Sequence, residues 1–212
     1  MTSIAVTKQG RATRERIVRA AAELVAEQGA AGTSLDDVRA ATGASKSQLY
    51  HYFGDKHGLV EAVVEFQCAT VLALQARALG SVNDWQDLEQ WADLMAAIVE
   101  DNGARGGCPI GTLAAALSDT DEGLRTSLSD AFGAWSDAIR GALTRLRENG
   151  LISRDADLDA LTTITLSAIE GGLLLTKTSR DADQLRTVLA GAIAKLKAHG
   201  TASRAHRRLS GG

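Results

Sequence analysis

The chain has 212 residues, which is enough to bury a substantial hydrophobic core in one or two domains. Hydrophobic residues make up 45% of the sequence and aromatic residues only 4%, and there is a single proline, so the composition favours helices packed through aliphatic side chains. The formal net charge of -3 excludes a protein that is basic throughout.

The first sixty residues are more basic than the rest of the chain. They contain eight basic and six acidic residues, whereas the remainder contains 15 basic and 20 acidic residues. Residues 1–11 are expected to form a flexible basic arm, which either contacts DNA or remains a solvated tail. An amphipathic helix is predicted from Thr13 to Gln28, and Gly29 ends it. Its apolar stripe comprises Ile17, Ala20, Ala21, Leu24 and Val25.

Residues 33–59 have the pattern of two short helices joined by a tight turn. Ser34 can cap the first helix, Gly43 can end it, and Ser45 can cap the second. Together with the preceding helix they would close one small core. This is the pattern of a helix-turn-helix, although corners between two helices have the same shape in proteins that bind no DNA.

The second of these helices is predicted to have an apolar side and a polar side. Leu49 and Phe53 are four residues apart and face the same way, so the opposite side carries hydrogen-bond donors and flat rings. Such a surface fits the major groove of DNA, where donors meet base edges and phosphate contacts position the protein. The candidate DNA-binding residues are Lys46, Ser47, Gln48, Tyr50, His51, Tyr52, Lys56, Ser34, Ser45 and Arg14.

Many positions between residues 12 and 60 follow one family pattern. They are Arg16-Ile17, Ala21-Ala22, Leu24, Gly29, Ser34-Leu35-Asp36-Asp37-Val38, Gly43-Ala44-Ser45-Lys46, Leu49-Tyr50-His51-Tyr52-Phe53, Lys56 and Leu59. With these residues the stretch resembles the N-terminal DNA-binding domain of TetR-type transcriptional regulators. Gln48 and Arg39 depart from the usual pattern, and both changes can alter the choice of operator.

The resemblance implies a homodimeric repressor that binds double-stranded operator DNA and releases it when a small molecule enters a helical pocket. It also implies that Lys46, Ser47 and Gln48 lie closest to base edges, whereas Tyr50 and Lys56 hold phosphates. The expected fold is all-α, with a three-helix helix-turn-helix domain followed by a larger helical domain for ligand binding and dimerisation.

The sequence predicts six further helices after the motif. We assign residues 12–55 to the DNA-binding domain, residues 56–199 to the effector-binding and dimerisation domain, and residues 200–212 to a disordered basic tail. The helices span about residues 56–79, 84–102, 109–117, 121–148, 158–179 and 182–198.

Aromatic, methionine and cysteine side chains of the second domain are candidates for an effector pocket. Few charged residues accompany them, so we expect an apolar or aromatic effector. Residues of this kind at helical spacing are also typical of an ordinary core. An isolated acid, Glu170, fits a polar group of the effector, a core hydrogen bond or a dimer contact equally well. The pocket candidates are Trp91, Met95, Cys108, Phe132, Trp135 and Glu170.

Cys108 suggests an alternative function. It lies in the turn Gly-Gly-Cys-Pro-Ile-Gly before a predicted helix, where the helix dipole lowers the pKa of a thiol and favours the thiolate. The turn also resembles a Gly-Cys-x-x-Gly stretch of some TetR-type proteins, a few of which sense oxidants or electrophiles. The simpler interpretation is a small buried residue, since no resolving cysteine is evident unless Cys68 approaches it.

The helix predicted at residues 158–179 is almost uncharged between Leu161 and Thr176, so it must be covered on more than one side. A second copy of the chain would supply this cover, and a purely intrachain core is the alternative. The candidate dimer contacts are Leu161, Ile164, Ala168, Gly171, Leu189 and Ile193.

Motifs for catalysis and for metal or cofactor binding are absent from the sequence. The four histidines are scattered, and there is neither a phosphate-binding glycine loop nor a Gly-x-Ser-x-Gly elbow. A helical enzyme that has kept the N-terminal corner for packing is therefore the weakest interpretation. Two cysteines form no disulfide framework in a chain of this size, and no signal peptide or transmembrane run is apparent, so we expect a cytoplasmic protein without a membrane partner.

Overall fold

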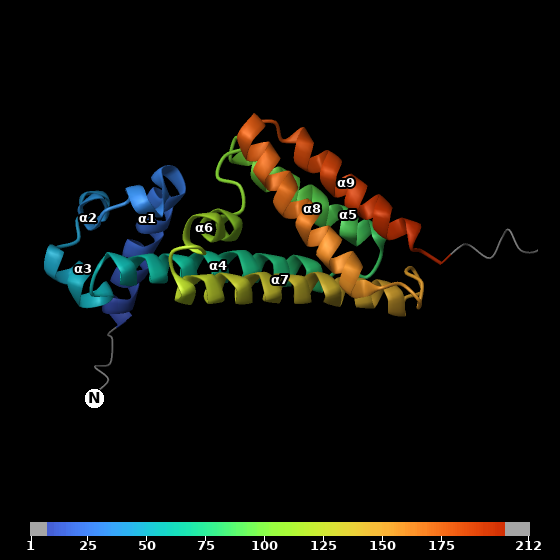
Figure 1. Cartoon of the computed structure of the whole chain (residues 1–212), viewed down its shortest axis with the longest axis horizontal. Helices are drawn as coiled ribbons and strands as arrows, with labels where there is room; N and C mark the ends of the chain where they lie inside the picture. Colours follow the sequence, from blue (N-terminus) through green and yellow to red (C-terminus); the bar gives the residue numbers. More distant parts are fainter. Residues whose placement is uncertain (1–7, 202–212) are drawn as a thin grey trace, which may run out of the picture. The chain divides into compact units, whose positions relative to one another are not determined.

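The computed structural model describes residues 8–201, which form α-helices and no β-strand (Figure 1). One isolated bridge pairs Ile152 with Gly200. The all-α fold expected from the sequence is thereby confirmed, while residues 1–7 of the predicted arm and 202–212 of the predicted tail lie outside the described residues. The helices are α1 Lys8–Gly32, α2 Leu35–Thr42, α3 Lys46–Phe53, α4 Lys56–Gly80, α5 Trp85–Asp101, α6 Pro109–Leu117, α7 Glu122–Glu148, α8 Leu158–Ser179 and α9 Asp183–Ala198.

Local capping explains several of these boundaries. Pro109 opens α6, and the Asp157 carboxylate accepts hydrogen bonds from two backbone N–H groups at the start of α8, both at 3.1 Å. The first helix differs from the prediction. It begins at Lys8, so residues 8–11 are helical, and it continues beyond Gly29, whose φ of 79° marks a kink.

The chain divides into two compact units. The first comprises residues up to Ala73 together with Cys108–Phe132, and the second comprises Leu74–Gly107 and the residues from Gly133 onward. Helices α4 and α7 each contribute to both units. The domain boundary expected between residues 55 and 56 therefore lies inside the first unit.

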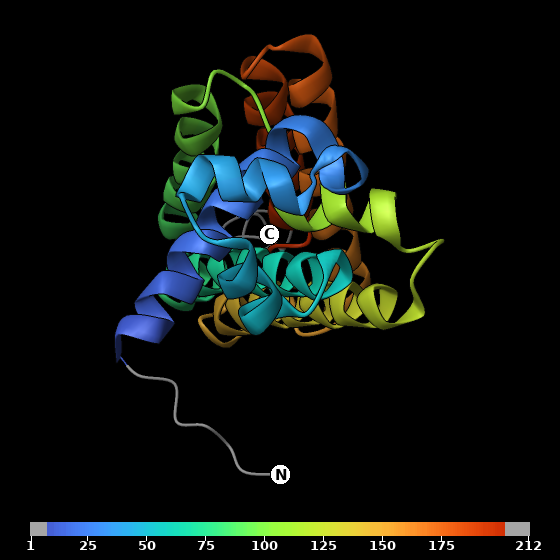
Figure 2. The same ribbon diagram turned by 90° about the vertical axis from the view of Figure 1, so that its left-hand side faces the viewer.

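Helices α1, α2 and α3 share a core in the first unit and gather at the N-terminal end of α4 (Figures 1 and 2). The buried stripe of α1 differs from the predicted one, since Val18 and Ala22 are buried whereas Ala20 and Leu24 are only half-buried. Both α2 and α6 contact α1, so its buried side is broader than one stripe. The core residues of these three helices include Ile17, Val18, Ala21, Ala22, Val25, Val38, Leu49 and Phe53.

In the second unit, α9 packs against both α8 and α5. The approach of α8 to α9 depends on Gly172, because a Cβ atom there would lie 3.0 Å from Leu185 Cδ1 and 3.3 Å from Val188 Cγ1. Two exposed ion pairs link α5 to α9: Arg186 with Glu100, and Lys197 with Glu89.

Helices α4 and α8 are long and apolar enough to cross a membrane by length and composition alone, although the sequence predicts no transmembrane run. Packing inside the protein accounts for much of the apolar character of α8. Its buried side includes Leu161, Thr165, Ile169 and Leu173, and the helix packs against α9.

Candidate nucleic-acid interface

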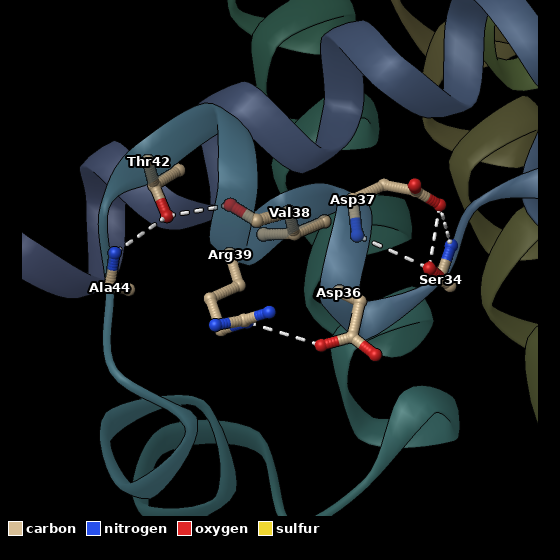
Figure 3. Close-up of polar contacts among 7 residues, drawn as sticks. All are labelled: Ser34, Asp36, Asp37, Val38, Arg39, Thr42 and Ala44. Carbon is tan, nitrogen blue, oxygen red and sulfur yellow. Dashed lines mark hydrogen bonds and ion pairs between the residues drawn. The ribbon is translucent and has the colours of Figure 1, made fainter.

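Helix α2 is fixed at its start by a capping box (Figure 3). The backbone N–H of Asp37 donates to Ser34 Oγ at 3.2 Å, and the backbone N–H of Ser34 donates to Asp37 Oδ2 at 2.9 Å. The Ser34 hydroxyl also donates to the same carboxylate oxygen at 2.6 Å. This hydroxyl bond, followed by the backbone bond, lowers the pKa of Asp37 below its ordinary value because both stabilise the carboxylate.

The turn between α2 and α3 is held by one threonine side chain. Thr42 Oγ1 donates to Val38 O at 2.7 Å and accepts from the Ala44 backbone N–H at 3.3 Å (Figure 3). Gly43 supplies the left-handed conformation, with φ 67°, that ends α2. Arg16 Nη1 of α1 donates to the Thr42 carbonyl at 2.5 Å, so the turn is also tied to the first helix.

Helix α3 begins with a second capping box, formed by Ser45 and Gln48. The Gln48 backbone N–H donates to Ser45 Oγ at 3.1 Å, and the Ser45 backbone N–H donates to Gln48 Oε1 at 2.9 Å. The spacing Ser-x-x-Gln is the signature of this motif in a sequence, so Gln48 has a capping role in addition to the predicted contact with DNA.

The polar side of α3 is exposed. Leu49 and Phe53 are buried, with 2% and 8% of their surface accessible, and therefore fix the orientation of the helix. The Lys46 ammonium lies 5.8 Å from the centre of the Tyr50 ring, a distance compatible with a cation–π contact. The exposed residues of α3 and its cap are Ser45, Lys46, Ser47, Gln48, Tyr50 and His51, and Tyr52 is half-buried.

The remaining candidate cations have partners within the protein. Lys56 Nζ donates to the carbonyl of Ala31 at 2.9 Å. The Arg14 guanidinium carbon lies 5.5 Å from the centre of the Phe53 ring, and Nη2 is 4.0 Å from a Glu65 carboxylate oxygen. Arg14 thus contacts α3 through Phe53, whereas Lys56 ties the start of α4 to the end of α1.

Two residues of this unit, Arg16 and His57, make contacts that the sequence did not predict. Arg16, noted only as part of a basic approach, ties α1 to the turn. His57 lies between two carboxylates, with Nε2 3.3 Å from Glu61 and Nδ1 3.3 Å from Asp121. Helical spacing signals the Glu61 contact, whereas Asp121 is 64 positions away and no local pattern predicts it.

Comparisons with known proteins agree with this geometry. A model of the tetR family of bacterial regulatory proteins matches residues 17–63, and a model of the C-terminal domain of LmrA/YxaF-like transcriptional regulators matches residues 85–190. An uncharacterised HTH-type regulator from the lacX 3' region of Lactococcus lactis is 30% identical over 84% of this chain and 89% of its own length. The chain belongs to the TetR family of transcriptional regulators.

Other relatives of this TetR-family regulator have the same general role. The transcriptional repressor DhaR of Mycobacterium sp. (strain GP1) is 26% identical over 81% of this chain and 86% of its own length. A TetR regulator of Chloroflexus aurantiacus with a solved structure is 26% identical, covers 93% of this chain and 100% of its own, and has a TM-score of 0.82. These relatives are transcriptional regulators and not enzymes.

The six pocket candidates of the TetR-family regulator are distributed over both units. Trp91 and Met95 share a partner in the second unit, where Trp91 Nε1 donates to Gln75 Oε1 at 3.0 Å and Gln75 Nε2 lies 3.0 Å from Met95 Sδ. Trp135 is also in this unit and is 1% exposed, while Glu170 is half-buried. Cys108, which is buried, and half-buried Phe132 belong to the first unit.

The dimer candidates also separate into two groups. Leu161, Leu189 and Ile193 are buried inside the protomer. Ile164 and Gly171 are exposed, and Ala168 is half-buried. The outer side of α8 carries two further leucines that are not among the predicted dimer contacts, Leu174 and Leu175, which are 64% and 55% exposed.

Proposed function

We propose that this TetR-family regulator is a cytoplasmic repressor that leaves its operator when a small, largely apolar or aromatic molecule binds. The exposed polar side of α3 carries the DNA-binding part of the proposal, because buried Leu49 and Phe53 orient it and a capping box fixes its start. Lys46, Ser47 and Gln48 would approach base edges, and Tyr50 and Lys56 would hold phosphates.

A gel-shift assay with DNA from upstream of the regulator's own gene tests this proposal. We expect binding that prefers one sequence and weakens as salt is raised, because phosphate contacts release counterions. Binding that is equal on all sequences, or no binding, would contradict it.

The proposed repressor acts as a homodimer through the outer side of α8. Ile164, Leu174 and Leu175 are 45%, 64% and 55% exposed, and together with Gly171 they form an uncharged surface, which we name the α8 outer face. Apolar side chains gathered on one helix side are typical of a protein–protein contact. In a two-fold dimer the same face would be supplied by both copies.

The effector is proposed to carry a hydrogen-bond acceptor on an otherwise apolar body. Trp135 is 1% exposed, and its Nε1 has no hydrogen-bond partner among the described residues. A buried donor normally has an acceptor, since leaving it unpaired costs about 1–3 kcal/mol. A carbonyl or ether oxygen of the effector would supply this acceptor.

A thiol-based sensor remains the second proposal because of the position of Cys108. The residue is the N-cap of α6, and its Sγ accepts a hydrogen bond from the Gly111 backbone N–H at 3.4 Å, which places the sulfur at the positive end of the helix dipole. With 6% of its surface accessible, the thiol would react only after local opening. If an oxidant releases DNA from the wild type and not from Cys108→Ser, the thiol function is supported. Release of DNA from both proteins contradicts it.

A further inference from the structure

Arg39 is an exposed cation on α2, the first of the two helices of the helix-turn-helix. Its Nε donates to Asp36 Oδ1 at 3.1 Å, one turn earlier on the same helix (Figure 3). The two terminal nitrogens, Nη1 and Nη2, make no hydrogen bond to any residue that the structure describes. A guanidinium has five N–H donors, so four of them are open to a ligand.

The local structure of α2 fixes one edge of this guanidinium. Asp37 is used by the capping box at the start of the helix, so Asp36 is the carboxylate of the first turn that pairs with Arg39. Val38 is buried, whereas 53% of the Arg39 side chain is exposed. In Figure 3 the side chains of Asp36 and Arg39 extend from α2 in the direction that the chain takes from Ala44 into α3. The open end of the guanidinium is therefore presented beside the turn of the motif.

We propose that Arg39 holds a phosphate of the DNA backbone, with Nη1 and Nη2 donating to two oxygens of one phosphate while Asp36 keeps Nε. In a helix-turn-helix the second helix lies in the major groove and the first crosses the backbone, which places α2 against phosphates. The planar fork of arginine matches two phosphate oxygens. This inference rests on the proposed entry of α3 into the groove. It gives Arg39 a role in binding every DNA sequence, beyond its effect on the choice of operator.

The partners of the neighbouring cations single out Arg39 for this role. Arg14, Arg16 and Lys56 each direct a terminal nitrogen to an oxygen of the protein. The Asp36 charge would repel the DNA backbone if it were alone, and Arg39 neutralises it. Because exposed ion pairs contribute little to stability, Arg39 is not needed for folding and its variants should fold.

The first test measures the affinity of the full chain for operator and random duplex DNA over a salt series. Arg39→Ala should weaken binding to both by roughly 10-fold per half-site, the lower range for a hydrogen bond to a charged group. The slope of log affinity against log salt should fall by about one per half-site, whereas Arg39→Lys should keep the slope because it keeps the charge. Arg77→Ala is the matched control, since Arg77 is exposed on α4 in the second unit, and it should change neither quantity.

The second test locates the contact by replacing single operator phosphates with neutral methylphosphonates. At one position of each half-site, the replacement should weaken binding of the wild type and of Arg77→Ala but have no effect on Arg39→Ala. Circular dichroism checks that the variants are folded.

Two results would overturn the inference. If every methylphosphonate weakens the wild type and Arg39→Ala equally, Arg39 holds no phosphate. If the loss in Arg39→Ala is confined to DNA with one particular base pair, Arg39 reads a base instead. A wild type that binds all sequences equally would refute the proposed operator-specific repressor, and the salt slopes on random duplex DNA would still decide the role of Arg39.

Discussion

Replacing Leu174 with alanine tests the α8 outer face as the dimer surface. The leucine is 64% exposed in the protomer, so most of its apolar surface is free to be covered by a second copy. The substitution removes three carbon atoms, each contributing about 0.8 kcal/mol when fully buried. Scaled by the exposed fraction, the loss is about 1.5 kcal/mol per protomer. Both copies contribute in a two-fold dimer, so dimerisation should weaken by about 3 kcal/mol, or roughly 100-fold.

Sedimentation equilibrium over a concentration series measures this change directly. Leu94→Ala is the matched control, because Leu94 on α5 is 42% exposed and lies outside the proposed surface. The reasoning is refuted if Leu174→Ala leaves the dimer constant unchanged, and an effect of Leu94→Ala alone would move the interface to α5. Leu189 is unsuitable for this experiment, since it is 1% exposed and a charge there would unfold the protomer.

Three further outcomes are expected. Lys56→Ala should weaken binding to all DNA sequences and reduce the slope of log affinity against log salt by about one charge. Lys56→Arg should keep most of the DNA affinity and most of the slope. A loss confined to one DNA sequence would contradict a phosphate contact. An effector found in a compound screen should lower operator affinity by about 1–3 kcal/mol, and operator DNA should lower effector affinity by the same factor. Trp135→Phe should bind the effector more weakly than the wild type does and should keep DNA binding. Equal effector affinity in the two proteins would exclude Trp135 as the hydrogen-bond donor to the effector. Because the pKa of Asp37 is lowered in the folded protein, its charged form stabilises the fold above the ordinary carboxyl range, and this contribution disappears as pH falls through the lowered pKa. Urea unfolding should therefore show that Asp37→Asn is less stable than the wild type at neutral pH and that the difference shrinks in acid. Asp130→Asn, at an exposed position of α7, is the control, and a difference independent of pH would assign the effect to packing.

Local chemistry made much of the fold predictable. Ser34, Gly43 and Ser45 occupy the capping and turn positions that their side chains and backbone freedom favour, and the structure uses them there. The same holds for the bounds of α6 and α8, which match the predicted ranges. These features depend on residues a few positions apart, so the sequence contains the information needed to locate them.

Contacts between distant helices were not predictable in the same way. Because α8 is nearly uncharged on all sides, its periodicity cannot show which apolar residues α9 covers and which remain exposed. Leu161 and Leu174 are alike in the sequence, yet the first is buried and the second is on the outer face. The pocket candidates have the same ambiguity, since Trp91 fills the core and pairs with Gln75, a buried polar residue that no local pattern distinguishes.

Gln48 shows how the exposure of a residue can be predicted while part of its chemistry is missed. Its exposed position on α3 follows from helical periodicity, and that alone suggests an amide free to pair with adenine. The serine three residues earlier gives this amide a second role, because the capping box uses its oxygen to hold the start of the helix. A smaller residue at position 48 would lose the side-chain half of the cap, whereas glutamate would keep an oxygen for it. If position 48 takes part in the choice of operator, a change of residue there is therefore expected to alter the stability of α3 as well.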